Sequence, residues 1–228
     1  MSKTINLINL ANLEKAYVDC IDGTTTNSSV FVQNMILREY EQDTKNPNLF
    51  AICLRLCGNN RHMDAVRLTD FDIPPICAAL LQKPCITVLD LRYNRITDTG
   101  ANVIAAFLKE DKLMEELNLM GNNITEVGAS EIASSLKVNS TLKELHLAKL
   151  DMRDFGAERI AEAMDCNQTL ELLDISGNRV ARDGAMSLSR AIMADCSLVI
   201  LDLAFNRIQC AGAIALASAL LTNTKLKV

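Results

Sequence analysis

Residues that could carry acid–base or metal chemistry are few in this sequence. It contains two histidines, His62 and His146, so a histidine-based catalytic group is difficult to assemble. Cys53, Cys57 and His62 offer three metal-ligating side chains, but their spacing matches no standard zinc finger. The sequence also lacks a GxxxxGKS/T phosphate loop, an HExxH zinc motif, a GxSxG nucleophile turn and a Cys-x-x-Cys pair. It therefore predicts no catalytic residue, no cofactor and no metal ligand.

Composition limits the class of protein further. The 228 residues are 49% hydrophobic and 22% charged, which is enough to bury a sizeable core. The sequence has no long apolar run and no secretory signal, so we expect a cytosolic or nuclear protein without a membrane span. A net charge of −5 without clustered Lys and Arg argues against nucleic acid as a partner. The eight cysteines stand singly within apolar patterns, which predicts reduced, buried thiols.

A regular repeat dominates the second half of the sequence. From residue 88, five segments follow at a spacing of 28 residues without insertion, and they read VLDLRYNRITDTGA, ELNLMGNNITEVGA, ELHLAKLDMRDFGA, LLDISGNRVARDGA and ILDLAFNRIQCAGA. Three columns recur in register: Leu89, Leu117, Leu145, Leu173 and Leu201; Leu91, Leu119, Leu147, Ile175 and Leu203; and Gly100, Gly128, Gly156, Gly184 and Gly212. Each copy joins the alternating apolar pattern of a strand to the four-residue spacing of a helix. Neither element can bury its apolar face alone, so we expect the copies to stack into a solenoid.

This pattern resembles the leucine-rich repeat family in its ribonuclease-inhibitor-like subclass, over residues 86–228 and part of 50–85. The resemblance implies an α/β fold, a right-handed leucine-rich repeat solenoid shaped as a horseshoe arc. Parallel β-strands would line its concave face and α-helices its convex face. We expect five strands centred on the first leucine column, each followed by a helix.

One column of the repeat holds asparagine at Asn94, Asn122, Asn178 and Asn206, and Leu150 in the third copy. We expect the asparagines to form a structural ladder that satisfies backbone groups in the turn leaving each strand. Leu150 has no hydrogen-bonding group, so it breaks this ladder, and the turn should be irregular there. Two interpretations stay open: Leu150 adds to the core, or it is pushed outward as a kink or an apolar contact point for a partner.

The sequence divides into three parts. Residues 1–50 contain two helical patterns, at 7–21 and 29–43, and are expected to form an N-terminal helical cap. Residues 51–85 contain LRLCGN and VRLTDFDI, each resembling the strand-and-turn half of an irregular, transitional repeat. Residues 86–228 hold the five regular repeats and, at TKLKV, the start of a sixth. We therefore expect further repeats of a longer chain, or another subunit, to cover the C-terminal edge.

Surface positions on the strands provide the candidate functional residues. The residue between the two inward leucines must point to the concave side, which gives the row Asp90, Asn118, His146, Asp174 and Asp202. The next row is Arg92, Met120, Ala148, Ser176 and Ala204. An acidic row beside small residues predicts a binding site for a basic segment or helix of a partner. The alternative is that these side chains, His146 included, are only solvated. Arg95, Arg179 and Arg207 lie on one rim with the same ambiguity.

The irregular stretch CLRLCGNNRHMDAVRLTDFDI followed by LDLRYNRITDTGA resembles the leucine-rich repeat-containing protein 34 group. That resemblance implies a non-enzymatic scaffold that binds other proteins in a ciliary axoneme, as part of a radial spoke, or in the nucleolus of stem and germ cells. A GTPase-regulating repeat domain is the competing class, although the long acidic tail of Ran GTPase-activating proteins is absent here. The sequence leaves open which protein is the partner and which face binds it.

Overall fold

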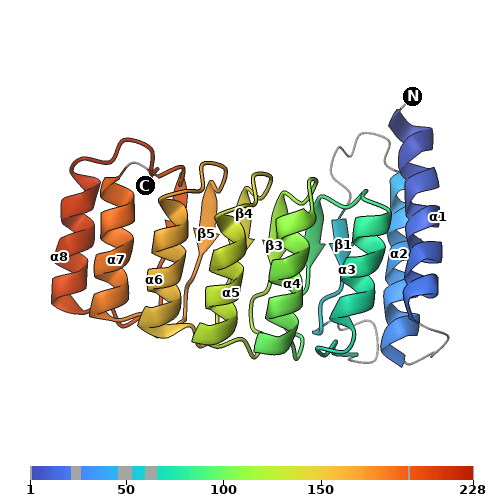
Figure 1. Cartoon of the computed structure of the whole chain (residues 1–228), viewed down its shortest axis with the longest axis horizontal. Helices are drawn as coiled ribbons and strands as arrows, with labels where there is room; N and C mark the ends of the chain where they lie inside the picture. The colour runs from blue at the N-terminus through green and yellow to red at the C-terminus, as the bar shows by residue number, and fades with distance from the viewer. Residues whose placement is uncertain (1, 22–26, 46–52, 60–65, 195, 228) are drawn as a thin grey trace.

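The computed structural model describes residues 2–21, 27–45, 53–59, 66–194 and 196–227. Its helices are α1 (Ser2–Cys20), α2 (Asn27–Lys45), α3 (Ile73–Gln82), α4 (Asp98–Glu110), α5 (Glu126–Leu136), α6 (Arg153–Met164), α7 (Arg182–Met193) and α8 (Gln209–Leu220). Its strands are β1 (Cys53–Arg55), β2 (Val88–Asp90), β3 (Glu116–Asn118), β4 (Glu144–His146), β5 (Leu172–Asp174) and β6 (Ile200–Asp202). Helices α3 to α8 stand side by side in one layer with the strands behind them, and α1 and α2 close the N-terminal end (Figure 1).

The strands form one parallel sheet in the order β1-β2-β3-β4-β5-β6. Neighbouring strands pair without slippage, so that Leu89 lies opposite Leu117, Leu117 opposite Leu145, and Leu173 opposite Leu201. This confirms the five predicted strands and the leucine-rich repeat solenoid, with helices on one face of the sheet. Parallel strands need crossover connections, and because crossovers are right-handed and the strands follow one another in a single direction across the sheet, the helices of all repeats pack on the same face.

Leucine and isoleucine side chains from strands and helices build one continuous core. Leu117 on β3 and Leu145 on β4 are fully buried, as are Ile132 on α5 and Ile160 on α6. Each such side chain contributes about 1.5–3 kcal/mol when it leaves water. Since every repeat buries this set against its neighbours, the solenoid is stabilised through the contacts between repeats.

The asparagine column forms the predicted ladder. The Asn122 side-chain amide donates to the backbone carbonyls of Leu91 (3.0 Å) and Leu119 (2.8 Å), and its Oδ1 accepts from the Ile96 amide at 3.2 Å. Asn94 and Asn206 make the equivalent bonds to their own repeat and to the preceding one. Each asparagine therefore satisfies buried peptide groups of two repeats at once.

Leu150 stays in its slot and is 7% exposed, so it adds to the core and the outward-facing interpretation is wrong. The Asn178 Oδ1 accepts from the Leu150 amide at 3.2 Å. The Ile96 amide bonds to the Asn122 Oδ1, whereas the side chain of Leu150 offers no acceptor to the equivalent Ile124 amide. Three residues later Arg153 adopts φ 50° where Thr97 and Thr125 are extended, but Gln209, the equivalent residue of the repeat with Asn206, also has a positive φ of 61°, so this difference does not come from Leu150.

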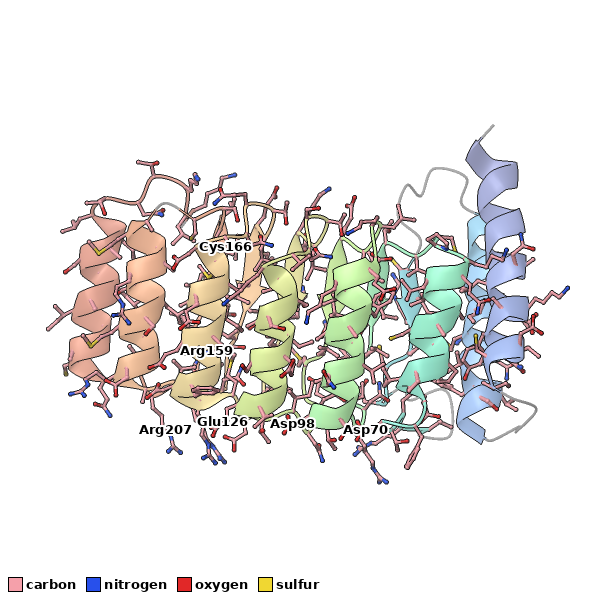
Figure 2. The ribbon with its side chains drawn as sticks, in the orientation of Figure 1. Asp70, Asp98, Glu126, Arg159, Cys166 and Arg207 are labelled. Carbon is pink, nitrogen blue, oxygen red and sulfur yellow. The ribbon has the colours of Figure 1, made fainter. Side chains whose placement is uncertain are left out.

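A second ladder, which the sequence analysis missed, joins the helix starts. The Asp98 carboxylate accepts from the Thr125 amide (2.7 Å), the Thr125 hydroxyl (2.7 Å) and the Gly128 amide (3.0 Å) of the next repeat. Asp70 binds Thr97 and Gly100 in the same way, and Figure 2 shows Asp70, Asp98 and Glu126 along the edge where the helices begin. A Cβ at Gly128 would lie 2.6 Å from the Asp98 Oδ1, and one at Gly100 2.6 Å from the Asp70 Oδ1, so the aspartate bonds require glycine at these two positions.

The part before the regular repeats differs from its prediction. VRLTDFDI, residues 66–73, forms no strand: Thr69 makes an isolated bridge to Arg95, and Ile73 begins α3. The Leu68 amide donates to the Asn94 Oδ1 at 2.9 Å, as Ile96 does to Asn122. Leu54 pairs with Leu89, 35 positions later, whereas Leu68 and Ile96 are 28 apart. The two apparent half-repeats are therefore one repeat, with seven extra residues between its strand and its helix.

The helices α1 and α2 lie close to the predicted ranges 7–21 and 29–43. Their buried side chains, among them Leu13, Tyr17, Phe31 and Ile36, join the core of the solenoid. The apolar end of the sheet is thereby covered, as a cap requires. None of the described helices is long and apolar enough to cross a membrane.

Cysteine burial follows the prediction in part. Cys77, Cys85 and Cys196 are buried, and burial raises the pKa of Cys77 to about 12 and that of Cys85 to about 11. Cys166 and Cys210 are exposed, so the expectation of buried thiols is wrong for these two. Both lie beside helix ends, where the repeat has no apolar slot to fill.

The ladder gives a stability prediction. Asn122→Ala should lower the free energy of unfolding by about 1–3 kcal/mol, because the Ile96 amide and the Leu119 carbonyl lose a buried partner. Leu150→Asn should be neutral or mildly stabilising, because the new Oδ1 can accept from the Ile124 amide while buried apolar surface is lost. Urea denaturation measures both, with the exposed neighbour change Asn123→Ala as control. A large loss for Leu150→Asn would mean that tight packing, and not hydrogen bonding, decides this slot.

Candidate functional site

The predicted surface row lies in register across the sheet. Asp90 is opposite Asn118, Asn118 opposite His146, His146 opposite Asp174, and Asp174 opposite Asp202. The five side chains share the face of the sheet that the helices do not cover. Their role in binding a partner stays a prediction, but the structure does bring them together.

Exposure along this row is uneven. Asp90 is 7% and Asn118 8% exposed, His146 and Asp174 are half-buried, and Asp202 is exposed. The side-chain oxygens of Asp90, Asn118, Asp174 and Asp202 each accept from the backbone amide two residues later, at 2.8–3.1 Å. These bonds fix the backbone where each strand ends, so part of the row has a structural task. The second oxygen of Asp174 and of Asp202 is left for other contacts.

His146 is the centre of an acidic cluster. Its Nε2 lies 3.9 Å from the Glu116 carboxylate and 3.8 Å from the Glu144 carboxylate, and its Nδ1 lies 3.8 Å from the Asp174 carboxylate. The four residues come from the adjacent strands β3, β4 and β5. We call Glu116, Glu144, His146, Asp174 and Asp202 the acidic patch.

Glu116 and Glu144 were missed by the sequence analysis. They lie two residues before the predicted row and therefore on the same face of the sheet. Burial, and then the charge of Glu144, raise the pKa of the Glu116 carboxyl, while His146 opposes the shift. Glu116 and Glu144 are 28 residues apart, but the other three members of their column are apolar, so the sequence pattern does not single them out.

The N-terminal end of the face differs in charge. The Arg92 Nε lies 3.1 Å from the Asp90 carboxylate, so a positive charge offsets the negative charge of this member of the predicted row. Cys57 lies beside the pair, and burial raises the pKa of its thiol. His62, the third member of the weak metal cluster considered with Cys53 and Cys57, lies outside the described residues.

The remaining residues of the second row are Met120, Ala148, Ser176 and Ala204. Ala148 is buried, Met120 and Ser176 are half-buried, and Ala204 is exposed. Their short or uncharged side chains leave the neighbouring carboxylates of the acidic patch accessible from the concave side.

The rim arginines separate into different environments. Arg179 Nη1 bonds to the Asp151 carboxylate at 3.0 Å, and Arg153 bonds to the same carboxylate at 2.9 Å. Arg179 and Arg207 also line a shallow pocket with Glu126, Arg153, Asp154 and Phe155. Arg95 is exposed. The rim is therefore a surface of mixed charge.

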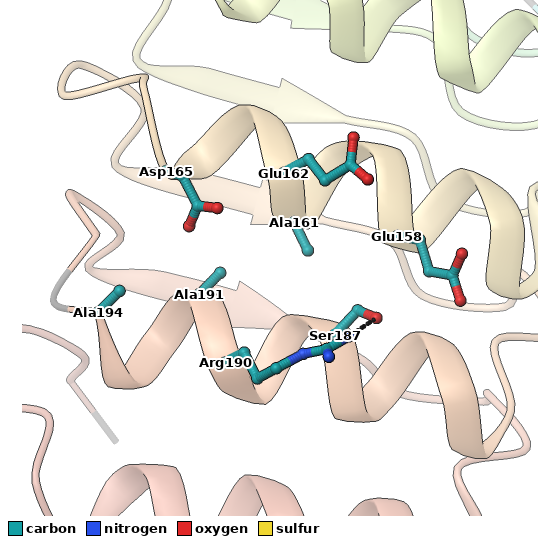
Figure 3. A pocket seen from close by; sticks show the side chains of 8 residues that line it. All are labelled: Glu158, Ala161, Glu162, Asp165, Ser187, Arg190, Ala191 and Ala194. Carbon is teal, nitrogen blue, oxygen red and sulfur yellow. Dashed lines mark hydrogen bonds between the residues drawn. The ribbon is translucent and has the colours of Figure 1, made fainter.

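The opposite, convex face carries a groove between α6 and α7. Figure 3 shows Glu158, Glu162 and Asp165 along its α6 side, and Arg190, whose Nη2 donates to the Ser187 hydroxyl at 2.8 Å, on its α7 side. Ala161, Ala191 and Ala194 complete the lining. The groove holds acids but neither a histidine nor a cysteine, so it offers no nucleophile–base pair.

The Asn139 and Asn167 side chains hold the loops that lead into the strands. The side-chain Nδ2 of Asn139 donates to the backbone carbonyl of Leu108 at 2.8 Å, and the side-chain Nδ2 of Asn167 donates to the backbone carbonyl of Leu136 at 2.8 Å. Both side-chain oxygens accept from amides two and three residues later. Their recurrence at the repeat period thus reflects a structural turn.

Comparison with known protein families agrees with this geometry. The family described as Leucine Rich repeat matches residues 82–105, 111–133, 166–189 and 194–217. The unmatched stretch between the second and third of these segments contains Leu150. No curated protein matches the chain significantly.

Two solved structures share the architecture. One is described as Leiomodin-1 Actin-Binding Site 2, with a TM-score of 0.51, 17% sequence identity, and coverage of 87% of this chain and 90% of that one. The other is the tropomodulin C-terminal domain of Caenorhabditis elegans, with a TM-score of 0.53, 14% identity, and coverage of 64% of this chain and 90% of that one. At such low identity the likeness shows the fold alone.

The register of the sheet and the asparagine ladder give the chain the fold of a leucine-rich repeat solenoid, and the Leucine Rich repeat family matches four segments of it. Its unit of 28 residues alternates a strand and a helix, as in the ribonuclease-inhibitor-like subclass that the sequence resembles. Repeats of this class commonly offer the extended concave surface for binding.

The crowding of charge at the cluster predicts a pH-dependent stability effect. Glu116→Gln should raise the free energy of unfolding at pH 7 by less than about 1 kcal/mol, because burial and Glu144 disfavour the ionised carboxylate in the folded protein. The pKa of Glu116 is raised on folding, so its ionisation costs stability above that pKa. The cost disappears as the pH falls through the folded pKa towards the ordinary value of about 4.3.

Urea denaturation of the parent and of Glu116→Gln at neutral pH and near the ordinary glutamate pKa measures this effect. The change Glu158→Gln, on the convex face, is the matched control. A difference of equal size at both pH values would attribute the effect to packing instead of charge.

Proposed function

We propose that the chain is a non-enzymatic docking module whose acidic patch binds a basic segment of another protein in a larger assembly. One observation carries this proposal. Across β3 to β6, the outward positions of the described strands and their exits hold four carboxylates, at Glu116, Glu144, Asp174 and Asp202, and no Lys or Arg. A Lys- or Arg-rich segment would find complementary charge along the whole of this surface.

The patch is suited to an extended partner. Its side chains stand on consecutive strands, which lie about 4.7–4.9 Å apart, with Glu116 and Glu144 at the first strand position and Asp174 and Asp202 at the third. A surface of like charges steers a partner of opposite charge and favours one register. Such a surface selects for charge pattern more than for a single side chain.

The assembly we propose is a ciliary axoneme, with the chain as a cytoplasmic component of a radial spoke. Support comes from the resemblance of the irregular stretch around residues 53–73 to the leucine-rich repeat-containing protein 34 group. A nucleolar adaptor in stem or germ cells is the alternative from the same resemblance. A GTPase-activating role is the remaining alternative, and a GTP-hydrolysis assay with candidate GTPases separates it from docking.

Charge reversal tests the docking surface. Glu144→Lys combined with Asp174→Lys should abolish capture of the native partner, because two attractive charges become repulsive. The control, Glu158→Lys combined with Asp165→Lys, makes the same change of net charge in the convex groove of Figure 3 and should retain the partner. Cross-linking and mass spectrometry in native material identify the partner and the face.

Two results would contradict the proposal. In the first, the convex variant loses the partner while the concave variant keeps it. In the second, the purified chain stimulates GTP hydrolysis by a GTPase, which would replace the docking class with a regulatory one.

We further propose that another repeat, from a longer polypeptide or a neighbouring subunit, covers the flank beyond β6 and α8. Ile200 is 47%, Ile214 66% and Leu221 87% exposed, while Leu203 is half-buried. The Lys227 amide donates to the Val199 carbonyl at 2.9 Å, as Glu171 does to Lys143, so a further strand can continue the sheet. An open edge beside an apolar flank favours association.

Light scattering of residues 1–228 over a concentration series tests this flank. The expected result is association that disappears when a polar capping repeat is fused after Leu226, together with a higher melting temperature. If the uncapped chain stays monomeric at high concentration and the cap changes neither mass nor melting temperature, the flank needs no cover.

A further inference from the structure

We infer that Glu116, Glu144 and His146 form a binding site for a divalent transition-metal ion of the zinc class on the concave face. Each offers one ligand atom, and these atoms all lie within 4.8 Å of one another. No other described group of histidine, cysteine and acidic side chains meets this geometry. The site is independent of the proposed docking partner, since it can bind its ion in the isolated chain.

The backbone holds the three ligands on one rigid surface. Glu144 and His146 are two residues apart on β4, so both point to the concave side, and Glu116 is paired opposite Glu144 on β3. The imidazole Nε2 is 3.9 Å from Glu116 and 3.8 Å from Glu144. With bonds of about 2.0–2.2 Å, two tetrahedral ligands of zinc are separated by about 3.4 Å. Contraction by a few tenths of an ångström therefore suffices between His146 and each acid.

The glutamates can make this movement. The Glu116 side chain is 34% and the Glu144 side chain 47% exposed, so neither is locked by packing. His146 is the more enclosed ligand, with its side chain 21% exposed. A fixed imidazole with two adjustable carboxylates can therefore close on an ion while leaving one position for water or a partner.

Asp174 supplies the outer contact that metal-binding histidines use. Its Oδ2 lies 3.8 Å from the His146 Nδ1, on the side of the ring away from the two glutamates. Closure by about 0.6–1 Å would allow Nδ1–H to donate to this carboxylate, which leaves Nε2 unprotonated and aimed at the ion. This arrangement distinguishes the site from a simple group of surface acids.

The donor set selects the kind of ion. One imidazole nitrogen and two carboxylate oxygens suit Zn²⁺ and Co²⁺, whereas Ca²⁺ and Mg²⁺ prefer oxygen ligands alone and copper(I) prefers thiolates. Glu116 and Glu144 are paired opposite each other on β3 and β4, and a cation would relieve the repulsion between two neighbouring carboxylates. A bound ion would neutralise part of the acidic patch, so the ion and a basic segment would compete for the same carboxylates.

A Co²⁺ titration of the purified 228-residue chain tests the site. Cys166→Ser and Cys210→Ser are introduced throughout, because these exposed thiols are competing ligands. We expect one equivalent of Co²⁺ to bind with a visible d–d band and without a sulfur-to-cobalt charge-transfer band, and Zn²⁺ to displace it. Equilibrium dialysis with Zn²⁺ alone gives the dissociation constant.

Four variants decide the outcome. His146→Asn and Glu144→Gln should each weaken binding at least about tenfold, and Asp174→Asn by about 10–100-fold, since it orients the imidazole. Asp202→Asn, an acid of the same patch that lies off the cluster, should bind as the parent does. Melting temperatures in the presence of a chelator confirm that each variant is folded.

Binding that is unchanged in both His146→Asn and Glu144→Gln would overturn the inference. So would a charge-transfer band that assigns the ion to thiolates, or the absence of binding at millimolar Co²⁺ and Zn²⁺. None of these results depends on whether a basic partner docks on the patch.

Discussion

Every part of this solenoid depends on satisfying the peptide groups at the point where a three-residue strand leaves the sheet. The turn that follows is buried, so its amides and carbonyls cannot reach water, and each unpaired group costs about 1–3 kcal/mol. Asn94, Asn122, Asn178 and Asn206 meet this requirement by bonding to their own repeat and to the one before it. The bond that completes one turn therefore also sets the position of the next repeat.

The same requirement shapes the functional face. A side-chain oxygen of Asp90 and one of Asn118 each accept from the backbone amide two residues later, and both residues are buried. Asp174 and Asp202 make the same bond but keep their second oxygen accessible. His146 has no carboxylate to offer its turn and instead faces three neighbouring acids. The carboxylates available to a partner are therefore those that the strand ends do not use fully for their own stabilisation. These carboxylates are concentrated over β3 to β6.

Strict spacing explains which features the sequence could predict. The strands, their pairing and the row from Asp90 to Asp202 follow from a period of 28 residues, because equal spacing forces equivalent residues into neighbouring positions. The repeat containing Leu54 and Leu68 was divided in two because seven extra residues interrupt that period. The partial burial of the row depends on Arg92 and on the local turn bonds, which alternation of apolar residues does not reveal.

Two omissions have a different cause. Asp70, Asp98 and Asp154 recur at multiples of the period, but most of their bonds are to backbone amides at the start of the next helix, which have no sequence signal. The recurring side-chain partners are the hydroxyls of Thr97 and Thr125. Glu116 and Glu144 share a column with Val88, Leu172 and Ile200, so no common residue type draws attention to it. Only the three-dimensional proximity of His146 gives this column its chemical interest.

The ladder bonds also determine how such a chain can fold and grow. In the regular repeats, the bonds from Asn122, Asn178 and Asn206 to the preceding repeat join residues 26 to 31 positions apart, whereas the bond from Asn94 to Leu56 spans 38 positions. The sequence separation of the contacts therefore stays nearly the same from β2 onward, and closing each new regular repeat costs about the same loop entropy as the last. Folding can begin at any well-formed pair and spread in both directions. Duplication can then add a whole repeat without lengthening any loop. The added repeat carries two complementary faces, one for the repeat before it and one for the repeat after it.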